Sequence, residues 1–114
     1  MAIKFNEMAK IKREALGLTQ AEFGEKAGVT GSTISKFEQG EWTTELVANA
    51  IKYAFGQLEN NLTSDELGAY KLRVAVESLI SETDEENKLM KLNTVVFAAT
   101  KWQDEILKKR RFNK

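Results

Sequence analysis

The side chains best able to do chemistry lie between residues 31 and 39, where hydrogen-bond donors recur on one side of a predicted short helix. Ser32, Lys36 and Gln39 follow one another at steps of four and three residues, which places them on one helical face. Ile34 and Phe37 occupy the other side and are expected to be buried. The pattern predicts a helix with a polar but not acidic face, for which an ordinary solvated surface is the alternative interpretation.

Most catalytic chemistry is excluded by composition. The chain contains no cysteine and no histidine, which removes disulfides, thiolate or imidazole zinc sites, thiol nucleophiles and histidine-based acid–base catalysis. An acidic cluster at Asp84, Glu85 and Glu86 remains, but acidic residues in a first helical turn are explained by the helix dipole. We therefore expect no enzyme activity, no metal and no cofactor.

Length and charge narrow the class further. The 114 residues amount to one domain with a short appendage, and 42% hydrophobic and 30% charged residues are typical of a globular fold. No apolar stretch is long enough to span a membrane and the N-terminus lacks signal-peptide features, so we expect a cytoplasmic protein. The 17 basic and 17 acidic residues disfavour a strong nonspecific polyanion binder but allow a few well-placed phosphate contacts.

Glycines and capping residues punctuate a chain that has no proline. Thr-x-x-Glu signatures that begin at Thr19, Thr63 and Thr83 predict three helix starts by capping boxes. Four glycines predict helix ends, namely Gly17, Gly28, Gly40 and Gly56. The expected fold is all-α, with helices over residues 5–16, 20–27, 31–39, 44–55 with a further turn through 62, 65–82 and 84–110.

The segment from Leu18 to Gly40 is the most informative part of the chain. It predicts a short capped helix, a turn at residues 28–30 and a second short helix, for which an ordinary helical hairpin is the alternative. The segment and its flanks resemble the lambda-repressor-like, or XRE-type, helix–turn–helix family over about residues 5–56. The matching residues are Arg13, Gly17-Leu18-Thr19-Gln20, Gly28-Val29-Thr30, Thr33-Ile34-Ser35-Lys36, Glu38, Gly40 and Ala54-Phe55-Gly56. The departures are Lys12, Phe23, Gly24, Phe37 and Thr43-Thr44, none of which lies on the face that would meet DNA.

This resemblance implies a helix–turn–helix domain of four to five helices over residues 1–62, followed by two longer helices over 63–114. It also implies that helix 31–39 enters the major groove of double-stranded DNA. Lys36 could then reach guanine O6 and N7, whereas Gly31 could contribute only its backbone. The candidate base-reading residues are Gly31, Ser32, Lys36 and Gln39. The candidates for phosphate contact or bracing are Lys10, Gln20, Thr30 and Thr33, with Lys4 and Lys52 as weaker ones.

Arg13 and Glu38 match the charged pair of the family, and we expect them to form a partly buried ion pair. Such a pair would hold helix 31–39 against the first helix and fix its approach to the groove.

The second half of the chain predicts two helices whose apolar arcs need a partner. The partner is either the first domain or the same region of a second subunit, and a two-fold dimer suits a reader of palindromic DNA. We expect Trp102 to anchor the dimer, with an intramolecular tryptophan as the alternative. The candidate dimer-interface residues are Leu92, Val95, Ala99, Trp102 and Ile106. Basic residues between Lys108 and Lys114 are expected to lie in solvent.

Together these features favour a sequence-specific DNA-binding transcriptional regulator, a homodimeric repressor of phage, plasmid or mobile-element type. A protein antagonist that binds the C-terminal helices is a candidate partner, and a membrane is not. The alternative is an antitoxin-like interaction module that neutralises a partner and autoregulates through the same domain. A neighbouring toxin gene, or a small protein that co-purifies, would favour that alternative.

Overall fold

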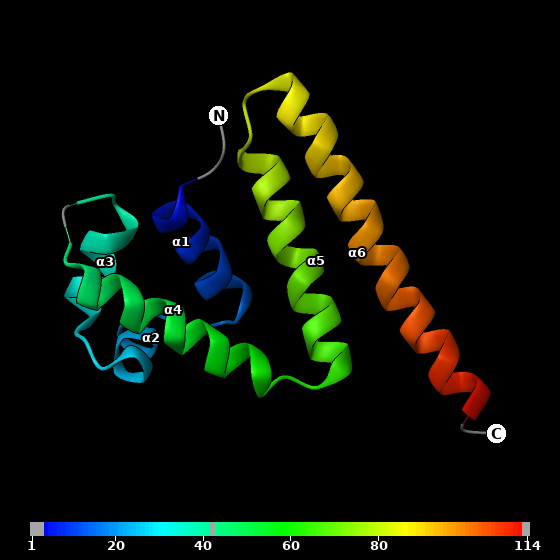
Figure 1. The fold of residues 1–114 in the computed structure, drawn as a ribbon, viewed down its shortest axis with the longest axis horizontal. Coiled ribbons are helices and arrows are strands. Elements are labelled where there is room, and N and C mark those ends of the chain that lie inside the picture. The colour runs from blue at the N-terminus through cyan, green and yellow to red at the C-terminus, as the bar shows by residue number, and fades with distance from the viewer. Residues whose placement is uncertain (1–3, 42, 113–114) are drawn as a thin grey trace. The chain divides into compact units, whose positions relative to one another are not determined.

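The computed structural model describes residues 4–41 and 43–112, with side chains through residue 110. Within these ranges every regular element is an α-helix, which confirms the expected all-α fold (Figure 1). The helices are α1 (Phe5–Ala15), α2 (Gln20–Ala27), α3 (Gly31–Glu38), α4 (Glu45–Asn60), α5 (Ser64–Ser81) and α6 (Glu85–Phe112). The described chain divides into two compact units, residues 4–61 with α1–α4 and residues 62–112 with α5 and α6.

The α1–α4 unit has a small aromatic and aliphatic core. Phe23, Ile34 and Ile51 are almost completely buried, one each from α2, α3 and α4. The Phe23 ring stacks on the ring of Phe55 with centroids 4.5 Å apart. Since these side chains are contributed by three helices, burial of their apolar surface holds the short α2 and α3 in place, although neither would be stable alone.

Threonine caps set the starts of most helices. The capping boxes predicted at Thr19 and Thr63 are both present, each with the threonine hydroxyl accepting from the glutamate N–H three residues on. The third, Thr83 with Glu86, is wrong. The Asp84 carboxylate instead accepts from the Asn87 N–H at 3.0 Å, so α6 starts at Glu85 with aspartate as its cap.

Three of the four glycines predicted to end helices do so. Gly17, Gly28 and Gly40 have φ of 74°, 76° and 81°, in the left-handed region that glycine enters without a steric cost. The prediction for Gly56 is wrong because α4 continues through it to Asn60. Leu58, beyond the glycine, packs against the core, and this contact favours extension of the helix over a stop at Gly56.

In the second unit α5 and α6 run antiparallel along one another (Figure 1). At one end Trp102 of α6 lies on Gly68 of α5, so close that a Cβ at residue 68 would be 2.6 Å from the indole ring. At the other end Lys91 Nζ and Glu82 Oε1 form an ion pair at 2.7 Å. Among the described residues no helix is both long and apolar enough to cross a membrane.

Candidate nucleic-acid interface

The two helices of the predicted motif cross at very short range. A Cβ at Gly31, the first residue of α3, would be 3.0 Å from Ala21 Cα in α2. A Cβ at Gly24 would be 2.8 Å from the carbonyl oxygen of Val29 in the intervening turn. Glycine at both positions therefore permits this crossing of α2 and α3, and the crossing fixes where α3 lies.

The α3 helix has one buried side and one exposed side. Ile34, Phe37 and Glu38 are buried, whereas Ser32 and Lys36 are exposed. The helix therefore presents a hydroxyl and an ammonium group, both of which can donate hydrogen bonds, to the outside of the unit.

Thr30 and Thr33 form the N-terminal cap of α3. The Thr30 hydroxyl accepts from the Thr33 N–H at 3.1 Å, and the two hydroxyls are 2.9 Å apart. At the other end Gln39 lies one residue beyond α3, and its side-chain amide donates to Ser35 Oγ at 3.0 Å. These two threonines hold the first turn of α3, and Gln39 is exposed at its end.

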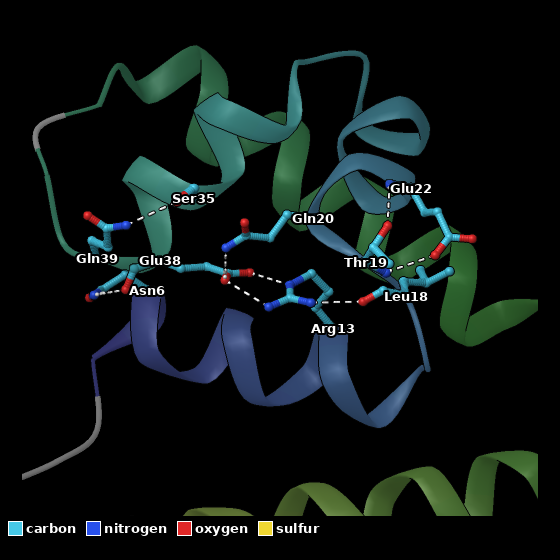
Figure 2. A network of polar contacts seen from close by, with 9 residues as sticks. All are labelled: Asn6, Arg13, Leu18, Thr19, Gln20, Glu22, Ser35, Glu38 and Gln39. Carbon is cyan, nitrogen blue, oxygen red and sulfur yellow. Dashed lines mark hydrogen bonds and ion pairs between the residues drawn. The ribbon is translucent and has the colours of Figure 1, made fainter.

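Arg13 and Glu38 lie against each other between α1 and α3 (Figure 2). Arg13 Nε donates to Glu38 Oε2 at 2.6 Å and Arg13 Nη2 donates to Glu38 Oε1 at 3.0 Å. The same guanidinium also donates from Nη1 to the Leu18 carbonyl oxygen at 2.8 Å. The hydrogen bonds to Glu38 raise the pKa of Arg13 above its ordinary value despite an opposing effect of burial, so this guanidinium stays charged.

Gln20 joins the same network from α2. Its side-chain Nε2 donates to Glu38 Oε1 at 3.1 Å, while Asn6 Nδ2 of α1 donates to the Glu38 carbonyl oxygen at 3.2 Å (Figure 2). Glu38 therefore receives hydrogen bonds from α1 and α2 and ties both helices to the end of α3. The sequence predicted that Gln20 braces the motif but not that Glu38 is its acceptor. No feature of the sequence predicted the contact of Asn6 with Glu38.

The remaining candidates of this unit lie apart from the network. Lys10 and Lys4 are exposed, and the ammonium of Lys52 lies 5.2 Å from the centroid of the Phe5 ring. Gly31, named as a base reader, is half-buried against α2, so it can bring only its backbone toward a ligand.

The residues predicted for a dimer interface share one stripe of α6 but differ in exposure. Trp102 lies on Gly68 and donates from Nε1 to Asp65 Oδ1 at 3.2 Å, so it packs within its own chain. Val95 is half-buried, while Leu92, Ala99 and Ile106 are exposed. No group of three or more acidic side chains gathers as it would around a metal ion in the part of the chain described.

The comparisons with known proteins agree with this geometry. A family model described as "Helix-turn-helix" matches residues 10–46, which include α2, the turn and α3. An HTH-type transcriptional regulator of Methanothermobacter thermautotrophicus is 42% identical over 60 residues, which are 50% of this chain and 87% of that protein. No solved structure gives a significant match. The chain belongs to the lambda-repressor-like, XRE-type helix–turn–helix family.

Proposed function

We propose that this chain is a sequence-specific DNA-binding transcriptional regulator that inserts α3 into the major groove. The observation that carries the proposal is the exposed donor face of α3, Ser32 and Lys36, held on a helix whose other side is buried. Membership of the helix–turn–helix family supports the same assignment, because such domains place the second helix of the motif in the groove.

Base contacts are assigned to the exposed side chains of α3. Lys36 reaches guanine O6 and N7, and Ser32 serves a base edge near the start of the helix. Gln39 reaches a base or phosphate at the far end once its bond to Ser35 gives way. Gly31 brings only its backbone toward the groove, because the direction that a Cβ would take points at Ala21 of α2.

Phosphate contacts are assigned to the start of α2 and its surroundings. The first turn of α2 leaves backbone N–H groups directed outward, and Gln20 lies at its first position. The side chain of Gln20 is tied to Glu38, so its role is to hold the start of α2 relative to α3. Thr30, Thr33 and Lys10 are the further candidates, and Lys10 is an exposed cation of α1.

The regulator acts in the cytoplasm as a homodimer on a palindromic operator and represses transcription by occupying it. Dimerisation supplies affinity that the near-neutral unit does not provide by charge, because a two-fold dimer binds two half-sites at once. Phage, plasmid and mobile elements are the proposed setting, and the C-terminal helices are where a protein antagonist would bind.

Selection of bound sequences from random duplex DNA, followed by affinity measurements on the preferred site, tests the proposal. Lys36→Ala is expected to weaken the preferred site by about 1–3 kcal/mol and to relax discrimination at one base pair per half-site. Lys26→Ala, which removes the same charge from the exposed last turn of α2, is the matched control and should leave base preference unchanged. Equal weakening of all sequences by Lys36→Ala would make Lys36 a phosphate contact, and failure to enrich any sequence would contradict the proposal.

A further inference from the structure

The α6 helix carries large apolar side chains that α5, the other helix of its unit, does not cover. The side toward α5 is defined by Lys91, which contacts Glu82 and the Ser78 carbonyl, and by Trp102 on Gly68. Away from α5, large apolar side chains are exposed. They are Leu89 at 65%, Met90 at 68%, Val96 at 62%, Phe97 at 68% and Leu107 at 47%. So many exposed apolar groups along one helix are unusual for a surface that meets only water.

Three of these apolar residues, Leu89, Val96 and Leu107, recur at intervals of seven and eleven residues and therefore share one face of α6. Steps of three and four residues connect its positions from one end of α6 to the other. These positions, called here the outer face, are Glu86, Leu89, Asn93, Val96, Thr100, Gln103, Leu107 and Arg110. All eight are exposed, and they extend over a helix of 28 residues that is about 42 Å long at 1.5 Å per residue.

Charge at the two ends of α6 distinguishes between the two orientations of a pair. The helix begins with Glu85 and Glu86 and approaches its end with Lys108, Lys109 and Arg110. Two copies side by side in parallel would bring acidic ends together and basic ends together, which is unfavourable. An antiparallel pair places each acidic end beside a basic end and also opposes the two helix dipoles favourably.

We propose that the outer face of α6 pairs with the same face of a second copy of this chain in an antiparallel, two-fold arrangement. The proposal deepens the homodimer of the proposed function and rests on it. In the register that brings Leu89 opposite Leu107 of the second copy, Val96 meets Thr100. The same register brings Glu86 opposite Arg110, so the leucine pair and the charged pair agree on one alignment.

The polar residues of the outer face fit this pairing as well. Asn93 falls opposite Gln103 of the second copy, where the two amides can exchange hydrogen bonds. Polar pairs at such positions specify the register and orientation of paired helices at some cost in stability. Phe97 lies beside the two-fold axis, while Leu92 and Ile106 widen the apolar surface on the other flank. Trp102 stays on α5, so the proposed surface keeps two of the flanking residues predicted from sequence and replaces the tryptophan anchor.

Solution mass tests whether the face pairs at all. The full-length protein is expected to sediment as a dimer at tens of micromolar, and Val96→Glu as a monomer with unchanged helix content by circular dichroism. Leu46→Glu changes an 80% exposed leucine of α4 and is the matched control, expected to remain a dimer. A monomeric wild-type chain, or a Val96→Glu variant that remains dimeric, would overturn the proposal.

Disulfide trapping tests orientation and register, and the chain suits it because it has no cysteine of its own. Residues 89 and 107 are 18 positions apart, about 27 Å along the helix, so antiparallel pairing keeps two copies of residue 89 far beyond disulfide reach. An affinity-tagged Leu89→Cys chain mixed with untagged Leu107→Cys should form a mixed covalent dimer under mild oxidation, and neither variant should do so alone. Self-linked dimers of each single variant would indicate a parallel pair and overturn the proposal.

The mass and trapping measurements contain no DNA, so they separate this inference from the DNA-binding proposal. A monomeric chain that still selects a DNA sequence would refute the pairing and leave the groove-reading role of α3 in place. A trapped antiparallel dimer that enriches no DNA sequence would support the pairing and refute the groove-reading role of α3.

Discussion

The bond between Arg13 and Glu38 provides a quantitative test of how α3 is held. Arg13→Met and Glu38→Leu each remove one charge and replace it with an apolar side chain of similar reach. The side chains are only 10% and 4% exposed, so each single substitution leaves the other group charged and almost without water.

The magnitude follows from what remains around each orphaned group. Without Glu38, Arg13 keeps its hydrogen bond to the Leu18 carbonyl, and without Arg13 the Glu38 carboxylate keeps its hydrogen bond from the Gln20 amide. Breaking a buried pair from one side costs about 3–5 kcal/mol, whereas replacing both partners by apolar residues can be nearly neutral. For a unit of this size a loss of 3 kcal/mol lowers the melting temperature by about 12 °C or more.

Calorimetry of the full-length wild type, both single variants and the double variant gives the melting temperatures for a double-mutant cycle of Arg13 and Glu38. We expect the double variant to melt above the less stable single variant, with part of the loss recovered. Lys10→Met, which removes an exposed charge from the same helix α1, is the control and should change stability by less than about 0.5 kcal/mol. Losses that simply add in the double variant would show that the two side chains do not stabilise each other, and would refute this account of the network.

Two further predictions concern the glycine crossing and the α5–α6 turn. Gly31→Ala should lower stability by about 1–3 kcal/mol because its Cβ would meet the backbone of Ala21, whereas Gly56→Ala, with no neighbour within 4 Å, should raise it by about 0.5–1 kcal/mol. Urea denaturation of both variants checks this, and equal stabilisation by the two would contradict the close crossing. The hydrogen bond from Lys91 lowers the pKa of Glu82 from its usual 4.5 to about 2, so its contribution to stability is complete above pH 5 and is lost as the pH falls toward 2. Glu82→Gln should destabilise the protein at pH 7 and flatten the dependence of melting temperature on pH between 5 and 2, and an unchanged slope would contradict the ion pair.

Local patterns predicted the fold well because local forces set most of it. The boxes at Thr19 and Thr63 involve groups three residues apart, and left-handed turns at Gly17, Gly28 and Gly40 need only the freedom of glycine. Gly56 and Thr83 were misread for the same physical reason. At Gly56, continuation of α4 lets Leu58 pack against the core, which outweighs the tendency of glycine to end a helix. At Thr83, the neighbouring Asp84 caps α6 in its place. Neither contact is part of the pattern from which the prediction was made.

Contacts between distant segments were harder to predict. The alignment with the family placed Arg13 beside Glu38, but no local pattern indicates that Gln20 and Asn6 also donate to Glu38. The spacing of apolar residues does not by itself indicate which side of α6 faces α5, because apolar residues lie almost all round that helix. Trp102 packs against α5 because Gly68 leaves room for an indole ring. That room depends on the sequence of α5, so the sequence of α6 alone does not predict the contact.

Affinity for DNA in which one ring nitrogen is replaced by a C–H group tests the central claim, that Lys36 of α3 reads the major groove. Each guanine of the selected site is replaced in turn by 7-deazaguanine, which lacks the N7 acceptor, and binding is measured for the wild type and for Lys36→Ala. The account predicts one position per half-site at which the wild type loses affinity and Lys36→Ala loses little more. Equal losses for the two proteins at every guanine, or no loss at any of them, would contradict it.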